Sequence, residues 1–440
     1  MRLTLLEILE ATGGGEVGGT QVGERFTTYH TDSREVRPGG VFFALRGAEM
    51  DGHRFIADAV ERGAAAVVVE HRTPVAAGIV EVVVPDTWKA LYDLASYVLQ
   101  RVHPLVVGIT GSNGKTSTKE MTAAVLGARF KVHRTMGNPN TETGVPLTLL
   151  ALEPEHTALV VEMGLQRPGD IAQLAALVKP RIGMITNIGV VHMEFFESQE
   201  ELARSKGELV AALPADGRAV LNAGDRYFPL LASLTKASVT TFGYEQGDFA
   251  VRGYRAGHFT VSGQAVELAL TGRHQALNAA AALAAGDAAG VPLADGAAAL
   301  GAVRVDHRLQ EIATKSGVTV VDDAYNASPE SMLAAFDAVA ERPRTGRLLA
   351  VLAHMGELGA LAEDSHELVG RRAADVFDAV VVVETPLGRI LAKAARADVV
   401  PDNASAAEWV RQHARAGDVV LIKGSHSRRL EEIVAELGAE

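Results

Sequence analysis

The stretch VVGITGSNGKTSTKE, residues 106–120, decides how the centre of this chain folds. Its first residues are apolar and predict a buried strand, its glycines predict a loop, and a helix is expected from Lys115 onward. This order brings backbone N–H groups and a helix N-terminus together on an anion, which suits phosphate. In such loops the lysine reaches the outer phosphates, and the next hydroxyl, here Thr116, holds Mg²⁺. We therefore predict that ATP binds at this loop.

The loop is a variant of the standard phosphate-binding pattern. That pattern has a glycine six positions before the lysine, with the second glycine directly before the lysine, and here Ile109 occupies the first position. A G-K-T tripeptide also occurs in ordinary turns, but the flanking strand and helix favour nucleotide binding. The residues expected to contact the phosphates are Gly111, Ser112, Asn113, Gly114, Lys115, Thr116 and Ser117.

Composition sets limits on the class of protein. The 440 residues suggest about three domains, and a net charge of −12 without a basic run argues against nucleic acid as a partner. The absence of cysteine excludes disulfides, thiol catalysis and cysteine metal sites. Glu7 and Glu10 interrupt the first apolar stretch, which does not resemble a signal peptide, and no apolar run is long enough for a membrane span. We expect a cytoplasmic protein.

The chain reads as three blocks, with boundaries expected at 1–100, 101–308 and 309–440. Apolar strands alternate with helical patterns in the second and third blocks, as in parallel sheets covered by helices on both faces. We expect an α/β protein with a small N-terminal α/β domain, a central parallel-sheet domain carrying the phosphate loop, and a Rossmann-like C-terminal domain. A connecting helix is expected at 86–104, and short antiparallel strands at 240–271.

Glu162 ends one apolar strand of the second block, and His192 lies just beyond the next. Both are therefore expected at the sheet edge where the phosphate loop lies, because ligands of such sheets bind at the carboxyl ends of the strands. A carboxylate there can bind Mg²⁺ as an oxygen ligand. Either residue alone would more simply be a strand-end or turn residue, but together beside a phosphate loop they favour a metal site.

Lys206 lies within the apolar stripe of the helix predicted at 198–214, which Ser198 and Glu201 should open with a capping box. A lysine in such a stripe usually extends its ammonium group to water, and spacing alone favours that interpretation. A functional role would need a lysine that is desolvated enough to be neutral and reactive.

Three further segments carry polar residues that could bind a ligand. His274 and Asn278 share one face of an alanine-rich helix, where a packing role is equally compatible. The dense polar run DDAYNASPESM, 322–332, follows a strand and favours a binding role, with Ser328 as the cap of the next helix. Lys423 and Ser425 follow the last strand and would suit a carboxylate or phosphate; the alternative is a plain turn with a solvated Arg428–Arg429 pair.

Taken in order, these motifs resemble those of the Mur ligases of bacterial peptidoglycan synthesis over nearly the whole chain. The shared features are TGSNGKT, the strand ends at Glu162 and His192, the K-x-E at Lys206, and the G-x-H…N of 272–278. DDAYNASPESM, MGELG (355–359) and KGSHSRRLEEIV (423–434) resemble the members that add D-Ala-D-Ala. The segments 31–47 and 51–56 look like the family's uridine-nucleotide domain, and 137–150 also matches.

The resemblance implies a reaction and its substrates. ATP would phosphorylate the terminal carboxylate of UDP-N-acetylmuramoyl-tripeptide, and the amine of D-Ala-D-Ala would attack the acyl phosphate to give an amide, ADP and phosphate. A carboxylate is a poor electrophile, and phosphorylation supplies a leaving group. Phosphoryl transfer depends on positioning and charge neutralisation. We expect a monomer that acts on these two substrates.

The resemblance also implies roles for individual residues. Lys115, His192 and Lys206 would be catalytic, and two Mg²⁺ ions would be held by Thr116, Glu162, His192 and a carbamylated Lys206. A carbamate replaces a buried cation with an anionic oxygen donor that a hard metal accepts. The nucleotide pocket would contain Asn278, Arg308, Asp323 and Asn326. The remaining substrate contacts would be Ser33 and Arg34 for the uridine nucleotide, and Asn138, Thr141, Lys423 and Ser425.

The chain departs from the family pattern at three places. His307 stands where the family has glycine before Arg308, Ala353–His354 replaces Gly-Asp before MGELG, and Thr141 ends an N-P-N-T that is usually N-x-N-N. These departures concern individual contacts rather than the reaction class.

Two alternatives remain open at this level. One is a related enzyme, either the tripeptide-forming Mur ligase or a polyglutamate-adding ligase, although DDAYNASP is not the motif expected of either. The other is a non-catalytic nucleotide switch built on a P-loop. A switch would need neither a uridine-nucleotide domain nor a second anion site such as KGSHS, and it would release phosphate without any amine.

Overall fold

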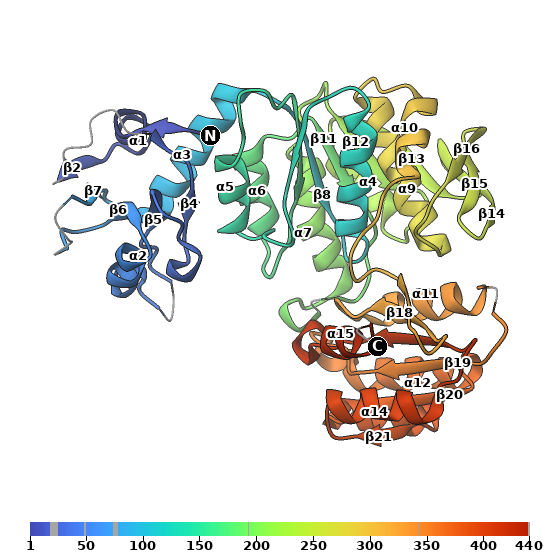
Figure 1. The fold of residues 1–440 in the computed structure, drawn as a ribbon. Coiled ribbons are helices and arrows are strands. Elements are labelled where there is room, and N and C mark those ends of the chain that lie inside the picture. Colours follow the sequence, from blue (N-terminus) through green and yellow to red (C-terminus); the bar gives the residue numbers. More distant parts are fainter. Residues whose placement is uncertain (18–24, 48–49, 74–77, 192, 343, 439–440) are drawn as a thin grey trace. The chain divides into compact units, whose positions relative to one another are not determined.

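The computed structural model describes residues 1–440 apart from 18–24, 48–49, 74–77, 192, 343 and 439–440. Figure 1 shows its helices and strands. The chain divides into two compact units. The first comprises Met1–Gly108, Arg129–Leu165 and Asp170–Arg181, and the second Ile109–Ala128, Gln166–Gly169 and Ile182–Glu440. In the described residues, every helix is too short or too polar to cross a lipid bilayer.

The first unit begins with a mostly parallel sheet of order β2-β7-β6-β5-β4, in which β2 runs antiparallel to β7. The bounds of the strands are β2 (Gly15–Val17), β4 (Tyr29–His30), β5 (Gly40–Phe43), β6 (Ala64–Val69) and β7 (Val80–Val83). The elements around it are β1 (Leu3–Thr4), β3 (Arg25–Phe26), α1 (Leu5–Thr12), η1 (Ser33–Glu35), η2 (Gly52–Phe55), α2 (Ile56–Glu61) and α3 (Thr87–Val102).

Helix α3 confirms the connecting helix expected from the sequence. Asp86 accepts a hydrogen bond from the Lys89 backbone N–H and caps its start, and His103, in the left-handed conformation before Pro104, ends it. The rest of the first unit consists of the start of β8 (Leu105–Thr110), then β9 (Val132–Arg134), α5 (Gly144–Leu150), β10 (Ala158–Glu162) and α6 (Asp170–Val178). β10 pairs in parallel with β9.

β8 enters the second unit at Ile109, and the sheet there has the order β8-β11-β12-β13-β14-β15-β16. Its further strands are β11 (Ile182–Ile185), β12 (Arg218–Asn222), β13 (Ser238–Tyr244), β14 (Phe249–Arg255), β15 (His258–Val261) and β16 (Gln264–Glu267). β14, β15 and β16 are antiparallel as expected, whereas β13 runs parallel to both β12 and β14, so that expectation was wrong for β13. In the turn between β13 and β14, Asp248 Oδ2 accepts a hydrogen bond from the Thr241 N–H. The next residue, Phe249, begins β14 and pairs with Phe242 of β13.

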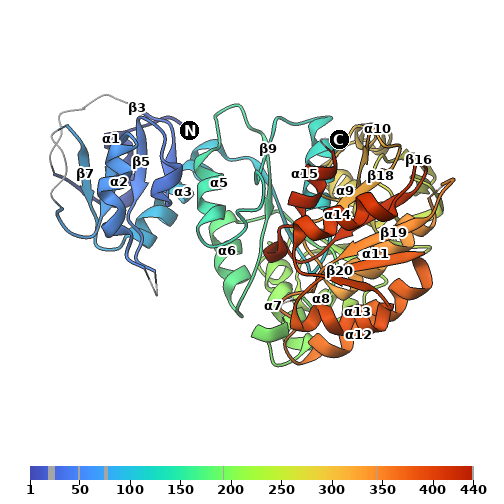
Figure 2. The ribbon, with the colours of Figure 1, turned by 60° about the horizontal axis from the view of Figure 1, so that its bottom comes forward.

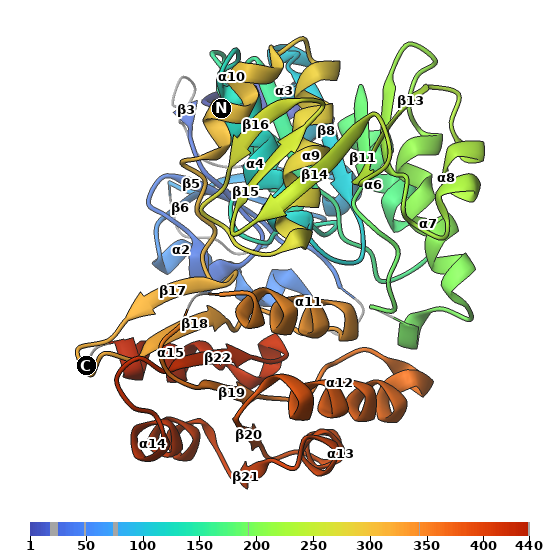
Figure 3. The same cartoon turned by 90° about the vertical axis from the view of Figure 1, so that its right-hand side faces the viewer.

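Helices cover both faces of this sheet (Figure 3). On one face α9 packs on the strands and α4 packs on α9, while α7 and α8 share an apolar cluster with β11 and β12 on the other. The bounds are α4 (Lys115–Gly127), η3 (Met193–Phe195), α7 (Gln199–Ala211), α8 (Phe228–Leu234), α9 (Arg273–Ala288) and α10 (Leu293–Leu300). Strand, loop and helix thus follow one another from β8 to α4, as predicted.

The C-terminal part of the second unit is a doubly wound sheet of order β17-β18-β22-β19-β20-β21, parallel except for β17. One apolar cluster joins it to α11, α12 and α13, and another on the opposite face joins it to α14 and α15 (Figure 2). The strands are β17 (Gln310–Ala313), β18 (Thr319–Asp323), β19 (Leu348–Leu352), β20 (Ala379–Val383), β21 (Asp398–Val400) and β22 (Val419–Lys423). The helices are α11 (Pro329–Ala340), η4 (Gly359–Leu361), α12 (Ala362–Val376), α13 (Pro386–Ala395), α14 (Asn403–His413), η5 (His426–Arg428) and α15 (Glu431–Gly438). The α/β fold with parallel, helix-covered sheets is confirmed.

Candidate active site

The phosphate loop requires glycine at two positions. Gly111 has φ of +149°, and a Cβ there would lie 1.9 Å from Thr186 Oγ1. Gly114 has φ of +81°, and a Cβ there would lie 2.6 Å from Asn278 Oδ1. Because both positions need a left-handed backbone and a close approach, any larger residue would deform the loop. Asn278, predicted as a nucleotide contact, therefore packs directly against this loop.

The end of β11 holds the backbone of Asn113 in place. Asn113 N donates to Asn187 Oδ1 at 3.0 Å, and Asn187 Nδ2 donates to Asn113 O at 3.1 Å. Thr186 Oγ1 donates to the same carbonyl at 2.6 Å. Thr186 and Asn187 were not predicted from the sequence, although their position at the carboxyl end of an apolar strand could have indicated a role at the site.

The side chains of the loop form hydrogen bonds both within the loop and with residues outside it. Lys115 Nζ donates to Gly111 O at 2.8 Å and to Ser112 O at 3.2 Å. The Gly189 N–H donates to Ser112 Oγ at 2.8 Å, and Ser328 Oγ donates to Asn113 Oδ1 at 2.9 Å. Asn113 Nδ2 is buried without a partner. Backbone donors, a lysine and an unused amide donor suit a phosphate group.

The spacing alone suggested that the Lys206 ammonium group reaches water, but in the structure it does not. It is 1% exposed in α7, and its Nζ donates to Gly111 O at 3.2 Å. Burial lowers the pKa of Lys206 well below its usual value, and the nearby Lys115 lowers it further. This is the environment in which a lysine amine is neutral.

The capping box predicted at the start of α7 is half formed. Ser198 Oγ accepts from the Glu201 N–H, as expected. The Glu201 carboxylate accepts from the Glu197 N–H at 2.8 Å instead of from Ser198, so it binds the backbone one residue earlier than the capping box requires.

Glu162, at the end of β10, lies in the first unit and is 1% exposed. Asn140 Nδ2 donates to its Oε1 at 2.8 Å and also to Asn138 Oδ1 at 3.1 Å. Thr141 Oγ1 lies 3.2 Å from Thr143 Oγ1. Asn140, which sequence analysis did not single out, thus connects the predicted metal ligand with the predicted substrate contact at Asn138.

The predicted Mg²⁺ ligands are distributed over the chain. Thr116 and Lys206 lie in the second unit and Glu162 in the first, while His192 lies outside the described residues. Within the described ranges, no group of three or more His, Asp or Glu side chains forms a metal cluster. A buried carboxylate and a hydroxyl at the start of α4 are the oxygen donors that Mg²⁺ accepts, and the metal site stays a prediction.

Lys423 and Asp323 form a buried ion pair in the C-terminal sheet. Their strands pair in parallel with the two Cα atoms opposite each other, and Nζ lies 2.6 Å from Asp323 Oδ2. Nζ also donates to Asn326 O at 2.9 Å. Burial lowers the pKa of Lys423, and the negative charge of Asp323 opposes this shift. Lys423 is therefore already engaged by Asp323 and Asn326.

Replacing Lys423 by methionine is expected to destabilise the C-terminal part by about 3–5 kcal/mol, because Asp323 would be left as an unpaired buried charge. The double substitution Lys423→Met with Asp323→Asn should cost less. Denaturation followed by Trp409 fluorescence in a Trp88→Phe background measures this, since the chain has 2 tryptophans. Lys393→Met, at an exposed position in α13, is the matched control. An equal loss of unfolding free energy in Lys423→Met and Lys393→Met would contradict the prediction.

The segment before β17 contains His307, at a position where the resemblance to the Mur ligases implies glycine. His307 has φ of +55°, which favours glycine, and its Nδ1 lies 2.6 Å from Asp322 Oδ2. The next residue, Arg308, places its guanidinium 4.3 Å from the centre of the Tyr325 ring, a cation–π contact. The Asp322 contact holds His307 in a conformation that its side chain disfavours.

Other predicted residues are placed as follows. Asn278 is buried, and its Nδ2 donates to Gln275 Oε1 at 3.1 Å. In the same helix, burial lowers the pKa of His274 to about 4. Ser425 is buried in the turn after β22. The short turn η5 follows Ser425, and α15 begins only at Glu431, so N–H groups of α15 do not surround Ser425.

In the N-terminal sheet region, Ser33 is buried and Arg34 is exposed. Asp32 caps η1, and Arg34 Nε donates to Asp32 Oδ1 at 2.9 Å. Both residues belong to one short turn after β4. Their role as uridine-nucleotide contacts stays a prediction.

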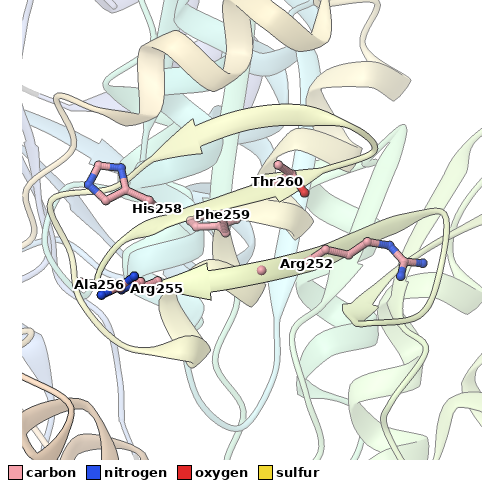
Figure 4. A pocket seen from close by; sticks show the side chains of 7 residues that line it. Arg252, Arg255, Ala256, His258, Phe259 and Thr260 are labelled. Atoms are coloured by element: carbon pink, nitrogen blue, oxygen red, sulfur yellow. The ribbon is translucent and has the colours of Figure 1, made fainter.

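A hollow of about 500 Å³ lies against β14 and β15 (Figure 4). It is lined by Arg252, Gly253, Arg255, Ala256, His258, Phe259 and Thr260. None of the residues predicted to carry chemistry lines it, and its arginines lie on a β-hairpin rather than at the carboxyl ends of the parallel strands. The phosphate loop is therefore the better candidate for the active site.

Three family models match successive parts of the chain. They are described as "Mur ligase family, catalytic domain" at residues 25–99, "Mur ligase middle domain" at 109–286, and "Mur ligase, glutamate ligase domain" at 307–426. The middle match contains the phosphate loop and Lys206, and the last contains Asp323 and Lys423.

Full-length relatives show the same similarity. The UDP-N-acetylmuramoyl-tripeptide–D-alanyl-D-alanine ligase of Bacillus subtilis is 37% identical over 426 residues, which cover 92% of each chain. Among solved structures, MurF from Acinetobacter baumannii matches with a TM-score of 0.89 at 29% identity, covering 100% of this chain and 99% of that one. MurF ligase from Thermotoga maritima in complex with ADP matches with a TM-score of 0.82 at 32% identity, covering 94% and 97%. The resemblance inferred from the motifs is confirmed, and the chain belongs to the Mur ligase family.

Proposed function

We propose that this protein is an ATP-dependent amide ligase that joins D-Ala-D-Ala to UDP-N-acetylmuramoyl-tripeptide in peptidoglycan precursor synthesis. The observation that carries the proposal is the 37% identity, over 92% of both chains, to a relative named for this reaction. The phosphate loop and the buried Lys206 beside it supply the chemistry that such a ligase needs.

ATP phosphates would lie on the loop from Gly111 to Ser117, with Lys115 neutralising their charge. Asn278, which packs against Gly114, supports a nucleotide at this loop, and Arg308, Asp323 and Asn326 would complete the pocket. Mg²⁺, when bound, would shield the charge of the transferring phosphoryl group. Thr116 and Glu162 would hold one ion, and Glu162, His192 and a carbamylated Lys206 the other.

The reaction would proceed in two steps at this loop. The tripeptide carboxylate would attack the outer phosphorus of ATP to give an acyl phosphate and ADP, and the dipeptide amine would then displace phosphate and lose a proton to form the amide. Lys115 would stabilise the charge that develops in the first step, which is the main contribution a protein makes to phosphoryl transfer.

The remaining substrate contacts follow the order of the chain. Residues 1–100 would bind the UDP-muramoyl part through Ser33 and Arg34, and Asn138 and Thr141 would contact the substrate near Glu162. Residues 101–308 would bind ATP. Residues 309–440 would bind D-Ala-D-Ala near Lys423 and Ser425, and a monomer would suffice for the reaction.

The test is phosphate release from Mg-ATP with and without each substrate. A ligase of this kind should release phosphate when UDP-N-acetylmuramoyl-tripeptide and D-Ala-D-Ala are both present, and should form the pentapeptide in equal amount. Release that ignores both would indicate a nucleotide switch. Activity with another amine, such as an amino acid, in place of D-Ala-D-Ala would indicate the tripeptide-forming or polyglutamate-adding alternative.

A further inference from the structure

The turn that follows β22 contains two adjacent arginines that the structure treats differently. Arg429 is exposed and its guanidinium lies 2.8 Å from Glu432. Arg428 is half-buried, its Nε is inaccessible and has no hydrogen-bond partner, and none of the described carboxylates pairs with it. A buried donor of a charged group left without an acceptor is costly, so Arg428 differs in kind from its neighbour.

His354, on the loop after β19, presents a second buried donor next to Arg428. Its Nδ1 is inaccessible and has no partner. The backbone joins the two residues through Ser425, because Ser425 N donates to His354 O at 3.1 Å and Arg428 N donates to Ser425 O at 2.9 Å. The positive charge of Arg428 acts on His354: burial lowers the pKa of His354 most, and Arg428 and then His366 lower it further. The ring is thus neutral and can donate through Nδ1.

The two unpaired donors lie where a ligand of this sheet would bind. β19 and β22 are parallel neighbours, and His354 and Arg428 follow their carboxyl ends. The residue sequence analysis favoured there, Lys423, is already engaged by Asp323 and Asn326. Gly356 lies close to Ser425, since a Cβ at Gly356 would be 3.4 Å from Ser425 Oγ. Because glycine has no side chain, it does not cover this hydroxyl. An acceptor group with negative charge would satisfy both donors together.

We propose that His354 and Arg428 form the subsite that binds the free carboxylate of the incoming dipeptide, with Ser425 as a further donor. The inference rests on the proposed function, because it assigns a site to one of its substrates. D-Ala-D-Ala reacts through its amine and has one carboxylate at its other end. Arginine and a neutral histidine can bind such a carboxylate through charge-assisted hydrogen bonds. The subsite selects acceptors that end in a carboxylate.

The experiment compares D-Ala-D-Ala with its C-terminal amide as acceptor. Arg428→Ala should raise KM for D-Ala-D-Ala by about 10- to 100-fold and change KM for the amide by less than about threefold. His354→Ala should have a similar but smaller effect, and His354→Asn, which keeps a donor near the position of Nδ1, should restore part of it. KM for ATP and for UDP-N-acetylmuramoyl-tripeptide should stay within about twofold of the wild-type values in all variants. Arg429→Ala is the matched control and should behave as wild type.

Each other outcome overturns the assignment. An equal loss with dipeptide and amide would mean that Arg428 only supports the turn, for instance by packing near Glu431, whose Oε2 is also buried and unpaired. A raised KM for ATP with an unchanged KM for D-Ala-D-Ala would place a phosphate at these donors instead. Unchanged kinetics in both variants would rule out the subsite while dipeptide-dependent phosphate release leaves the proposed function intact. Wild-type release that ignores D-Ala-D-Ala would instead refute the proposed function itself.

Discussion

Replacing Lys206 by arginine is expected to lower kcat by more than about 100-fold. Only a neutral amine can add CO2, which gives a carbamate and releases a proton. Lys206 is 1% exposed, and burial together with Lys115 lowers its pKa, so the structure favours the neutral amine. Arginine stays protonated and would put a permanent charge beside Lys115 in place of an anionic metal ligand.

Lys206→Ala separates the missing carbamate from a folding defect. It should be as inactive as Lys206→Arg, but the cavity left by the side chain lies next to Gly111 O, which Nζ contacts at 3.2 Å. A short carboxylate such as formate or acetate can enter that space and supply the lost anionic oxygen. We expect added formate or acetate to restore part of kcat in Lys206→Ala and none in Lys206→Arg.

The proposed carbamate on Lys206 can be tested directly with isotope-labelled bicarbonate and NMR of the wild-type enzyme. The carbamate signal should disappear in Lys206→Ala and persist in Lys236→Arg, a control at an exposed position. Near-normal turnover of Lys206→Arg would contradict the carbamate hypothesis. Inactivity without any effect of formate or acetate and without the labelled signal would leave Lys206 with a packing role only.

Local signals in the sequence were sufficient for the elements that hold the site. The strand–loop–helix from β8 to α4, the cap of α3 at Asp86 and the cap of α11 at Ser328 all depend on residues close together in the chain. Such patterns are decided by steric and hydrogen-bonding rules within one turn. The family, too, was recognisable from motifs in their order.

What the sequence could not predict depends on packing between distant residues. Spacing placed Lys206 on an apolar face, but only the fold shows that this face buries the ammonium group against Gly111. Arg428 and Arg429 are equivalent in sequence, but the turn after β22 leaves Arg428 half-buried with an inaccessible Nε and exposes Arg429. Thr186 and Asn187 are far from the phosphate loop in sequence and bind it only because β11 lies beside β8 in the second unit. The strand-end position of Thr186 and Asn187 could have indicated a role at the site, but the contacts themselves depend on how distant segments pack.

Replacing Lys115 by methionine is expected to lower kcat by about 100- to 1,000-fold, for two reasons that can be separated. First, the substitution would remove the cation that we propose neutralises charge on the transferring phosphoryl group. Second, it removes the charge that helps to keep Lys206 neutral, since Lys115 lowers the pKa of Lys206. Lys206 would then be protonated over a wider pH range and less available for CO2.

The two effects differ in their dependence on pH. Without Lys115 the pKa of Lys206 rises, so the acidic limb of the kcat profile should move to higher pH, while the loss of phosphoryl stabilisation persists at every pH. Both effects act through one site. The double variant Lys115→Met/Lys206→Ala should therefore lose far less kcat than the product of the two single fold-losses. Lys131→Met, at an exposed position after α4, is the control. A profile that keeps its position, together with fully additive losses, would show that Lys115 and Lys206 act independently. A shifted profile with non-additive losses would show that one lysine keeps the other reactive.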